Sequence, residues 1–203
     1  GCGDSEPTAT KHYTNLEEVS MADWKALAGK KIYFGHQSVG YNIMDGVEAI
    51  LAQQDGAELN IVEVENELPD AEGYFAHGRV GENTHPDKKI AAFEAFMEAN
   101  AAEKPDTAFF KFCYVDIRED TDVDAVFNQY VDAMSRLEQQ YPDVRFVHLT
   151  VPLTQKPEGF KGFKQWVKGV LGKSRYGIDD NIKRGQYNDL LRQKYQASGN
   201  LFD

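Results

Sequence analysis

Segments with a helical spacing of apolar residues alternate along the chain with short apolar runs, and no internal repeat is present. Apolar residues recur every three or four positions in the helical segments, which is typical of amphipathic helices. The runs between them are rich in Val, Ile, Phe and Tyr and predict strands. Helices are predicted over residues 15–28, 38–51, 87–102, 122–140 and 179–197, and strands over 31–35, 59–64, 108–117, 144–151 and 200–203.

This alternation predicts a parallel sheet with helices on both faces. Because crossover connections are right-handed, the simplest arrangement is an α/β fold: a flavodoxin-like, three-layer α/β/α sandwich with a mostly parallel five-stranded sheet. The run 108–117 is the most hydrophobic and predicts a central strand, with Cys113 as a buried residue. The stretch 65–86 is too long for a simple connection and is a candidate functional loop, and a second long connection, 152–178, is rich in Lys, Gly and aromatic residues.

Residues 15–203 are predicted to form one domain, because the chain of 203 residues is 41% apolar and can bury a sizeable core. Residues 1–14 lack apolar periodicity and predict a flexible tether. The Gly-Cys start resembles the mature end of a bacterial lipoprotein, in which a lipidated Cys follows the cleaved signal peptide. We therefore expect a lipid anchor at Cys2 and a location in the cell envelope, on its periplasmic or extracellular face. The alternative is an incidental thiol.

Charge and hydropathy argue against several classes of partner. The 33 acidic and 22 basic side chains give a net charge of −11, whereas affinity for nucleic acid requires clustered Lys and Arg. The same balance argues against docking on anionic lipid through a basic patch. No apolar run approaches the roughly 20 residues that span a bilayer, so we expect membrane contact only through Cys2. The sequence does not indicate an oligomeric state.

Ser38 is the first candidate for chemistry, at the predicted turn from the first strand into the second helix. In open α/β sheets ligands bind beyond the carboxyl ends of the strands, and a helix N-terminus there favours developing negative charge. Gly35 and Gly40 are expected to let the backbone turn tightly. Serine is also a preferred helix N-cap, so Ser38 is either a nucleophile or a cap. His36 is either its base or a polar residue on the rim.

A second candidate segment spans residues 77–86. Gly81 allows a peptide N–H to approach a ligand closely, and Asn83 offers a side-chain donor. Arg79 is suited to an anionic group or, equally, to a surface ion pair. His77 and His85 do not belong to a short cluster with the spacing of a zinc site, so we expect no metal and no cofactor.

Together these residues resemble the SGNH (GDSL-type) hydrolase superfamily over about residues 29–203, through the order and spacing of degenerate motifs. Gly-His-Gln-Ser-Val-Gly resembles its first block, with Ser38 at the nucleophile position. Gly81 falls at the second-block glycine, whose N–H helps to form the oxyanion hole. Cys113-Tyr114-Val115-Asp116 falls at the third block, Gly-x-Asn-Asp, and Asn200-Leu201-Phe202-Asp203 resembles the approach to the last block, Asp-x-x-His.

The resemblance implies a serine esterase or acyl hydrolase that acts on an ester, with an acylated glycan as the candidate substrate. Ser38 would attack the carbonyl after an imidazole, oriented by Asp203, removes its proton. The N–H groups of Ser38 and Gly81 and one side-chain amide would bind the negative oxygen. The other expected oxyanion and substrate contacts are Asn83, Arg79, Asp116 and Tyr114.

Two departures from the superfamily pattern leave alternatives open. Val115 stands at the position of the oxyanion Asn, so this donor is absent or supplied elsewhere, with Asn83 as the candidate. No His follows Asp203, so either the domain lacks its C-terminal end and the natural chain continues, or another residue such as His36 is the base. A domain that has lost activity and binds carbohydrate or an envelope partner would fit the same sequence. A phosphate-binding, flavodoxin-like module fits less well, since the turn lacks the Lys of a P-loop.

Three further patterns have simpler interpretations. Phe160, Phe163 and Trp166 predict either a sugar-binding lid or partner surface, or an amphipathic helix that packs on the domain. His148 is predicted to be a core histidine. The acidic residues between 116 and 124 are expected to complement a helix dipole rather than to bind calcium.

Overall fold

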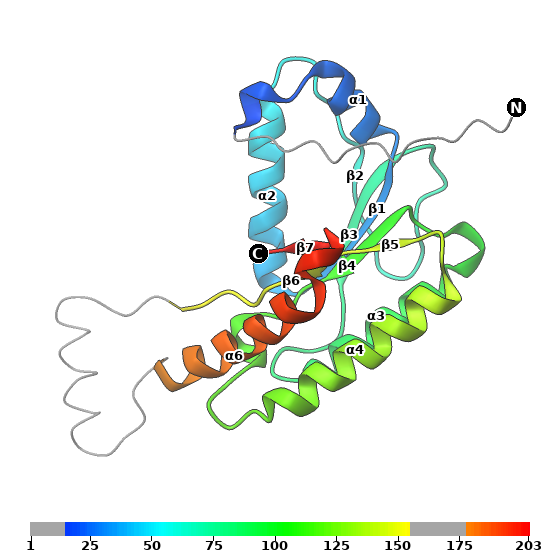
Figure 1. Cartoon of the computed structure of the whole chain (residues 1–203). Coiled ribbons are helices and arrows are strands. Elements are labelled where there is room, and N and C mark those ends of the chain that lie inside the picture. The colour runs from blue at the N-terminus through cyan, green and yellow to red at the C-terminus, as the bar shows by residue number, and fades with distance from the viewer. Residues whose placement is uncertain (1–14, 155–177) are drawn as a thin grey trace, which may run out of the picture.

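The computed structural model describes residues 15–154 and 178–203. In this part of the chain, five parallel strands form a sheet of order β2-β3-β1-β4-β5 (Figure 1). They are β1 (Lys31–His36), β2 (Ile61–Glu63), β3 (Tyr74–Arg79), β4 (Thr107–Phe110) and β5 (Arg145–Phe146). Helices cover both faces, so the predicted α/β/α sandwich with a five-stranded sheet is confirmed.

Aromatic packing joins the central strand β1 to the helical layers. Tyr33 stacks on Phe96 with ring centroids 3.9 Å apart, whereas Phe34 contacts Phe109 on the opposite face. Successive side chains of a strand point to opposite faces, so these contacts distinguish the two layers. Helix α2 (Ser38–Ala52) lies on the Phe34 face, while α3 (Pro86–Ala99) and α4 (Val123–Gln140) cover the other face, with α6 (Ile178–Tyr195) packed against α4.

All five predicted helices are present, with ends that differ by a few residues. The first is divided, because Ser20 accepts the Asp23 N–H and starts a new helix there. No helix among the described residues is both long and apolar enough to cross a bilayer. The shorter helices are η1 (Leu16–Glu18), α1 (Met21–Ala28), η2 (Ala101–Glu103), η3 (Tyr114–Asp116) and η4 (Gln196–Ser198).

Strand β3 is the main difference from the prediction, because it lies within the stretch 65–86 that was expected to be a loop. Its sequence, Tyr-Phe-Ala-His-Gly-Arg, lacks the β-branched residues that mark a strand. A Cβ at Gly78 would lie 2.1 Å from the carbonyl oxygen of Val64, so close strand packing requires this glycine. Since β3 pairs with β1, Gly81 and Asn83 follow a strand beside the Ser38 turn rather than a free loop.

The C-terminal strands also differ from the prediction. The expected strand 144–151 is split into β5, which pairs with β4, and β6 (His148–Leu149), which pairs with β7 (Leu201–Phe202) in a separate two-stranded sheet. The expected strand 108–117 ends at Phe110, because the chain turns at η3. The Asp116 carboxylate accepts the Cys113 N–H at 2.6 Å and stabilises this turn.

Candidate active site

Ser38 is the first residue of α2, and its side chain is exposed. Gln37 occupies the N-cap position, and no side chain caps the helix. The Ser38 hydroxyl makes no hydrogen bond to another residue of the described chain. It therefore does not act as the helix cap that its sequence position would also suit. The Ser38 N–H lies in the first turn of a 15-residue helix, where backbone donors have no intrahelical acceptor and the dipole is positive.

Gly35 and Gly40, on either side of this turn, allow close packing rather than unusual backbone angles. Neither has a positive φ. A Cβ at Gly40 would lie 2.0 Å from Cγ of His36, so α2 packs directly on the imidazole ring. A Cβ at Gly35 would lie 2.9 Å from Cγ1 of Val80. These two glycines are therefore needed for close contact between α2 and the sheet, and not for the tight turn that was expected.

The Gln37 side chain joins the Ser38 turn to the turn after β3. Its Nε2 donates to the carbonyl oxygens of Val80 at 3.0 Å and Gly81 at 2.6 Å. Gly81 has a φ of +61°, and a Cβ there would lie 2.6 Å from the backbone of Lys89. Only glycine fits this conformation and this contact. The Gly81 N–H donates to no acceptor among the described residues, so it is free to bind a ligand.

Asn83, Lys89 and Asp116 form a buried group beside this turn, which we call the Lys89 cluster. The Lys89 ammonium donates to Oδ2 of Asp116 at 2.5 Å and to Oδ1 of Asn83 at 2.9 Å. The side chains of Lys89 and Asp116 have no exposed area. Because an ammonium can only donate, the amide oxygen of Asn83 faces Lys89, and its Nδ2 lies on the other side. That Nδ2 donates to no described acceptor and remains available.

Asp116 joins its own turn at η3 to the turn after β3 and to helix α3, rather than contacting a ligand. Besides the Lys89 ammonium, its carboxylate accepts the Cys113 N–H at 2.6 Å and the Thr84 N–H at 2.8 Å. Asp116 is only 3% exposed, so no substrate reaches its oxygens. The sequence-based interpretation of Asp116 as an oxyanion or substrate contact is therefore replaced by a structural role.

His36 is fully buried, and both of its ring nitrogens are occupied. Nδ1 lies 2.7 Å from the Gln37 carbonyl oxygen and Nε2 lies 2.9 Å from Nδ1 of His77. A carbonyl only accepts, so Nδ1 of His36 carries the proton and its Nε2 accepts from His77. Burial lowers the pKa of both imidazoles, which favours their neutral forms. His36 therefore offers no nitrogen to Ser38, and this geometry does not support it as the base.

Arg79, at the end of β3, contacts Tyr41 of α2. Its Nε donates to the Tyr41 hydroxyl at 3.3 Å, and its guanidinium lies 5.5 Å from the centroid of that ring. The Tyr41 hydroxyl in turn donates to the Glu63 carboxylate. Arg79 is exposed and forms no ion pair within the described chain. The structure thus places Arg79 on the α2 side of the site, joined to a neighbouring helix rather than to the Lys89 cluster.

Asp203 follows β7 and is bound by Arg192. Its two carboxylate oxygens each accept a hydrogen bond from the Arg192 guanidinium at 2.7 Å. This pairing lowers the pKa of Asp203, so the carboxylate is ionised at neutral pH. No imidazole of the described residues forms a hydrogen bond with Asp203 or Ser38. The structure therefore brings together Ser38, Gly81 and Asn83 at one edge, but it does not join Ser38 to Asp203 through a base.

Tyr114 and Val115 line a pocket of about 280 Å³ next to the Lys89 cluster. Val115 is half-buried and supplies no polar atom where the SGNH resemblance would lead one to expect Asn. Tyr114 is 39% exposed and faces solvent on one side. Of the residues expected to contact an oxyanion or substrate, Gly81, Asn83, Arg79 and Tyr114 thus present accessible groups, whereas Asp116 does not.

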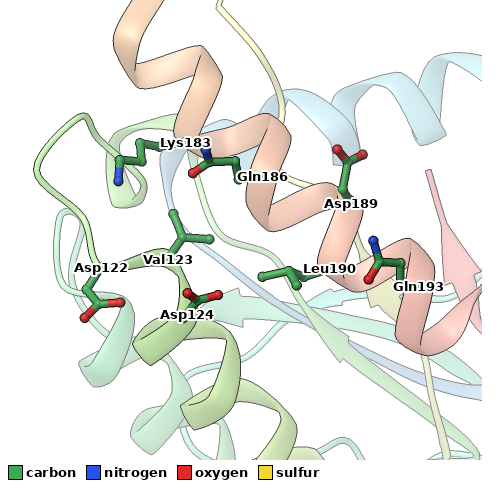
Figure 2. Close-up of a pocket in the computed structure, with 8 residues that line it drawn as sticks. All are labelled: Asp122, Val123, Asp124, Lys183, Gln186, Asp189, Leu190 and Gln193. Carbon is green, nitrogen blue, oxygen red and sulfur yellow. The ribbon is translucent and has the colours of Figure 1, made fainter.

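A second hollow, of about 500 Å³, lies between the start of α4 and helix α6 (Figure 2). Asp122 caps α4 by accepting the Ala125 N–H at 3.0 Å, and Asp124 follows in the first turn. The predicted place at a helix start is thus confirmed for Asp122 and Asp124, whereas Asp116, which was expected in the same group, pairs with Lys89 instead. None of the polar side chains of this hollow is buried, and no metal-binding group of three or more His, Cys, Asp or Glu occurs among the described residues.

Other predicted residues have simpler positions. His148 is 1% exposed and contacts the Tyr130 hydroxyl at 2.7 Å, which confirms it as a core histidine. Cys113 is buried, as expected. Cys2 and the aromatic residues Phe160, Phe163 and Trp166 lie outside the described residues.

Two buried lysines, Lys89 and Lys111, were not anticipated. Lys89 lies on the same face of α3 as Phe93, Phe96 and Met97. A charged residue on an apolar helical face is a sequence pattern from which its burial could have been predicted. Lys111 is the one charged residue in the apolar run 108–115. It is 4% exposed and lies next to β4, and burial lowers the pKa of its ammonium.

Comparisons with known proteins add little to this geometry. No protein-family model matches the sequence, and no curated protein matches it. Among solved structures, a chain described as "a putative platelet activating factor from Streptococcus pneumonia" is similar over 89% of this chain and 70% of its own, at 15% identity and a TM-score of 0.48. A likeness at this level concerns the arrangement of helices and strands alone and says nothing about activity.

Proposed function

We propose that this chain is an SGNH-type serine hydrolase that cleaves an ester, with Ser38 as the nucleophile. The observation that carries this proposal is the Ser38 turn itself. An exposed hydroxyl that caps nothing lies at a helix N-terminus, at the sheet edge where three N–H donors have no described acceptor. These donors are the Ser38 N–H, the Gly81 N–H and the Asn83 amide. Because these donors have no described acceptor and the positive end of the helix dipole lies at the same edge, they are available to bind a developing negative charge.

The reaction follows from where charge develops. A base removes the Ser38 proton, and Oγ attacks the ester carbonyl carbon while the carbonyl oxygen becomes negative. The three donors and the dipole of α2 stabilise this oxygen. Collapse of the intermediate breaks the bond to the alcohol, which leaves with the proton, and water then hydrolyses the acyl-serine.

In this proposal Asn83 replaces the third-block Asn that Val115 cannot supply. Lys89 binds Oδ1 of Asn83 at 2.9 Å and so fixes the orientation of the amide before substrate arrives. A donor held in this way needs no reorganisation during the reaction, and losing one such donor costs about 3 kcal/mol of transition-state stabilisation.

None of the described residues is placed to act as the general base for Ser38. The SGNH resemblance implies an imidazole as this base, and the ionised Asp203 carboxylate is suited to orient it. We also propose, from the sequence, that Cys2 anchors the protein at the envelope. Detergent-phase partition of the natural protein, lost in Cys2→Ala, would support the anchor, and unchanged partition would contradict it.

The occupied nitrogens of His36 favour a second candidate, a catalytically impaired domain of the same type that binds carbohydrate or an envelope partner. Reaction of the natural full-length protein with a fluorophosphonate probe separates the two. For a hydrolase we expect one label per chain at Ser38 and hydrolysis of nitrophenyl acetate, both abolished in Ser38→Ala. Ser135→Ala, at an exposed serine on α4, is the matched control and should retain both. Absence of labelling and hydrolysis in the natural protein would favour the binding domain.

A further inference from the structure

Lys111 is a buried cation without a partner. It is 4% exposed, and its ammonium forms no hydrogen bond or ion pair with any described residue. The fully enclosed side-chain atoms that lack a partner in this part of the chain are Nε1 of Trp24 and the hydroxyls of Tyr74 and Tyr141. The Lys111 nitrogen is not one of them, so it retains accessible surface. Lysine is rarely buried unless it is paired, so this position favours an anionic partner that the described residues do not supply.

The parallel register places Lys111 at the Ser38 edge. Its N–H donates to the Gly35 carbonyl oxygen at 3.1 Å, which extends the pairing of β1 with β4 by one residue. Side chains of a strand alternate between faces, so Lys111 lies on the same face as Phe109, which packs on the α2 side of the sheet. The adjacent side chain of β1 on that face is His36, and the first turn of α2 packs directly on its ring. Burial is the main cause of the lowered pKa of His36, and the charge of Lys111 adds to it, as expected for neighbouring side chains. Lys111 is therefore directed toward the start of α2.

The start of α2 adds positive potential at the same place. This helix has 15 residues, and no side chain caps its N-terminus. The N–H of Gly40 donates to the Gln37 carbonyl oxygen, whereas the N–H groups of Ser38 and Val39 donate to no described acceptor. Free backbone donors and the positive end of a helix dipole favour an anion. The Lys111 ammonium contributes a charged donor to this edge from a separate strand.

The buried charges around Lys111 do not balance. Asp116 is the one buried carboxylate among the described residues, and Lys89 pairs with it at 2.5 Å. Burial is the main cause of the lowered pKa of Lys111, and the nearby charge of Lys89 lowers it further. Two buried ammonium groups thus accompany one carboxylate, and one positive charge has no counter-charge. An anion with a single negative charge restores the balance, which fits a carboxylate better than a phosphate monoester, whose charge at neutral pH is about −1.5 to −2.

We propose that Lys111 binds a carboxylate group of the substrate, so that the ester cleaved at Ser38 is anionic. The carboxylate accepts from the Lys111 ammonium, while the ester carbonyl oxygen lies at the Ser38, Gly81 and Asn83 donors. A hydrogen bond between two charged groups is about twice as strong as one between neutral groups. This inference rests on the proposed function for hydrolysis, but binding of a carboxylate can be tested without it.

The first experiment measures binding of acetate and acetamide, which have the same shape and differ in charge, to the natural full-length protein. Saturable broadening of the ligand methyl resonance in NMR reports binding. We expect acetate to bind about tenfold or more tightly than acetamide, and Lys111→Met to remove this difference. Lys25→Met, at an exposed lysine of α1, is the matched control and should leave it unchanged.

The urea midpoint of Lys111→Met should not fall, because an apolar side chain of similar length replaces a buried charge. If this variant does not fold, Lys111→Gln takes its place in the same measurement. Equal binding of acetate and acetamide, or a difference that persists without the Lys111 ammonium, would overturn the carboxylate site.

The second experiment compares 4-nitrophenyl hydrogen adipate with methyl 4-nitrophenyl adipate, which lacks the charge. We expect kcat/KM to favour the anionic ester by about tenfold or more, mainly through KM, and Lys111→Met to remove the preference. Equal kcat/KM for the two esters would overturn the anionic substrate while leaving the hydrolase intact. Acetate binding that depends on Lys111, without hydrolysis of either ester, would support the carboxylate site and contradict the hydrolase.

Discussion

The Lys89–Asp116 pair and the Arg192–Asp203 pair both lie beyond the carboxyl ends of strands, but they differ in burial. The first pair has no exposed side-chain area, whereas the side chains of Arg192 and Asp203 are 37% and 49% exposed. Charges in the interior interact strongly and are expensive to leave unpaired, while solvent screens those at the surface. The donor side of the candidate site is therefore fixed by the fold, and the Asp203 side is held only by a surface contact.

Lys89→Met should show the largest effect of this difference. The substitution leaves the Asp116 carboxylate buried without its cation, so we expect the free energy of unfolding to fall by about 3–5 kcal/mol. Urea unfolding measures the loss. Adding Asp116→Asn removes the unpaired charge and should recover part of the stability. A loss below about 1 kcal/mol in Lys89→Met would show that the Lys89–Asp116 pair is solvated. The two ion pairs would then not differ in their contribution to stability.

Asn83→Asp tests the catalytic side of the same cluster. The new carboxylate still accepts from Lys89, but it cannot donate to an oxyanion. If the proposed hydrolysis holds, we expect kcat to fall by about 10²–10³-fold with little change in KM. The urea midpoint should stay close to that of the natural protein, because Lys89 keeps an acceptor. An unchanged kcat would exclude Asn83 as an oxyanion donor.

The layers of the fold could be predicted because they depend on periodicity, which is local. Strand β3 could not, because its stability comes from pairing with β1 and β2 and from a glycine that allows close approach to Val64. The split of 144–151 likewise depends on partners in two different sheets. Such non-local pairing overrides local propensity.

The candidate site was predictable to a similar extent. The sequence indicated Ser38 at the turn after a predicted strand, and it indicated Gly81 and Asn83 through their residue types in the long loop 65–86 and the order of the SGNH-like motifs. The partners of Asp116 and His36 were not predictable, since Lys89 and His77 lie 27 and 41 residues from them in the sequence. Those contacts decide that Asp116 is structural and that His36 has no free nitrogen.

His148 provides a test on the C-terminal side, where it is buried in β6. It stacks on Tyr195, contacts the Tyr130 hydroxyl and has Glu138 3.8 Å away. Burial lowers its pKa from the ordinary 6.5 to about 4. The unfolded chain then binds more protons between these values, so stability is lost as pH falls from 6.5 to 4, by on the order of 3 kcal/mol. Urea titrations should show this loss reduced in His148→Gln and unchanged in the control His85→Gln, and equal slopes in all three proteins would contradict it.

Asp203→Asn should have the smallest effect on stability. The pairing with Arg192 has good bidentate geometry, but both side chains are exposed, so we expect the free energy of unfolding to change by less than about 1 kcal/mol. The change should shrink further in 1 M salt, where the screening length is about 3 Å. A double-mutant cycle with Arg192→Gln isolates the coupling between the two side chains. Coupling above about 2 kcal/mol would mean that this pair is shielded from solvent, and the two sides of the site would then be equally rigid.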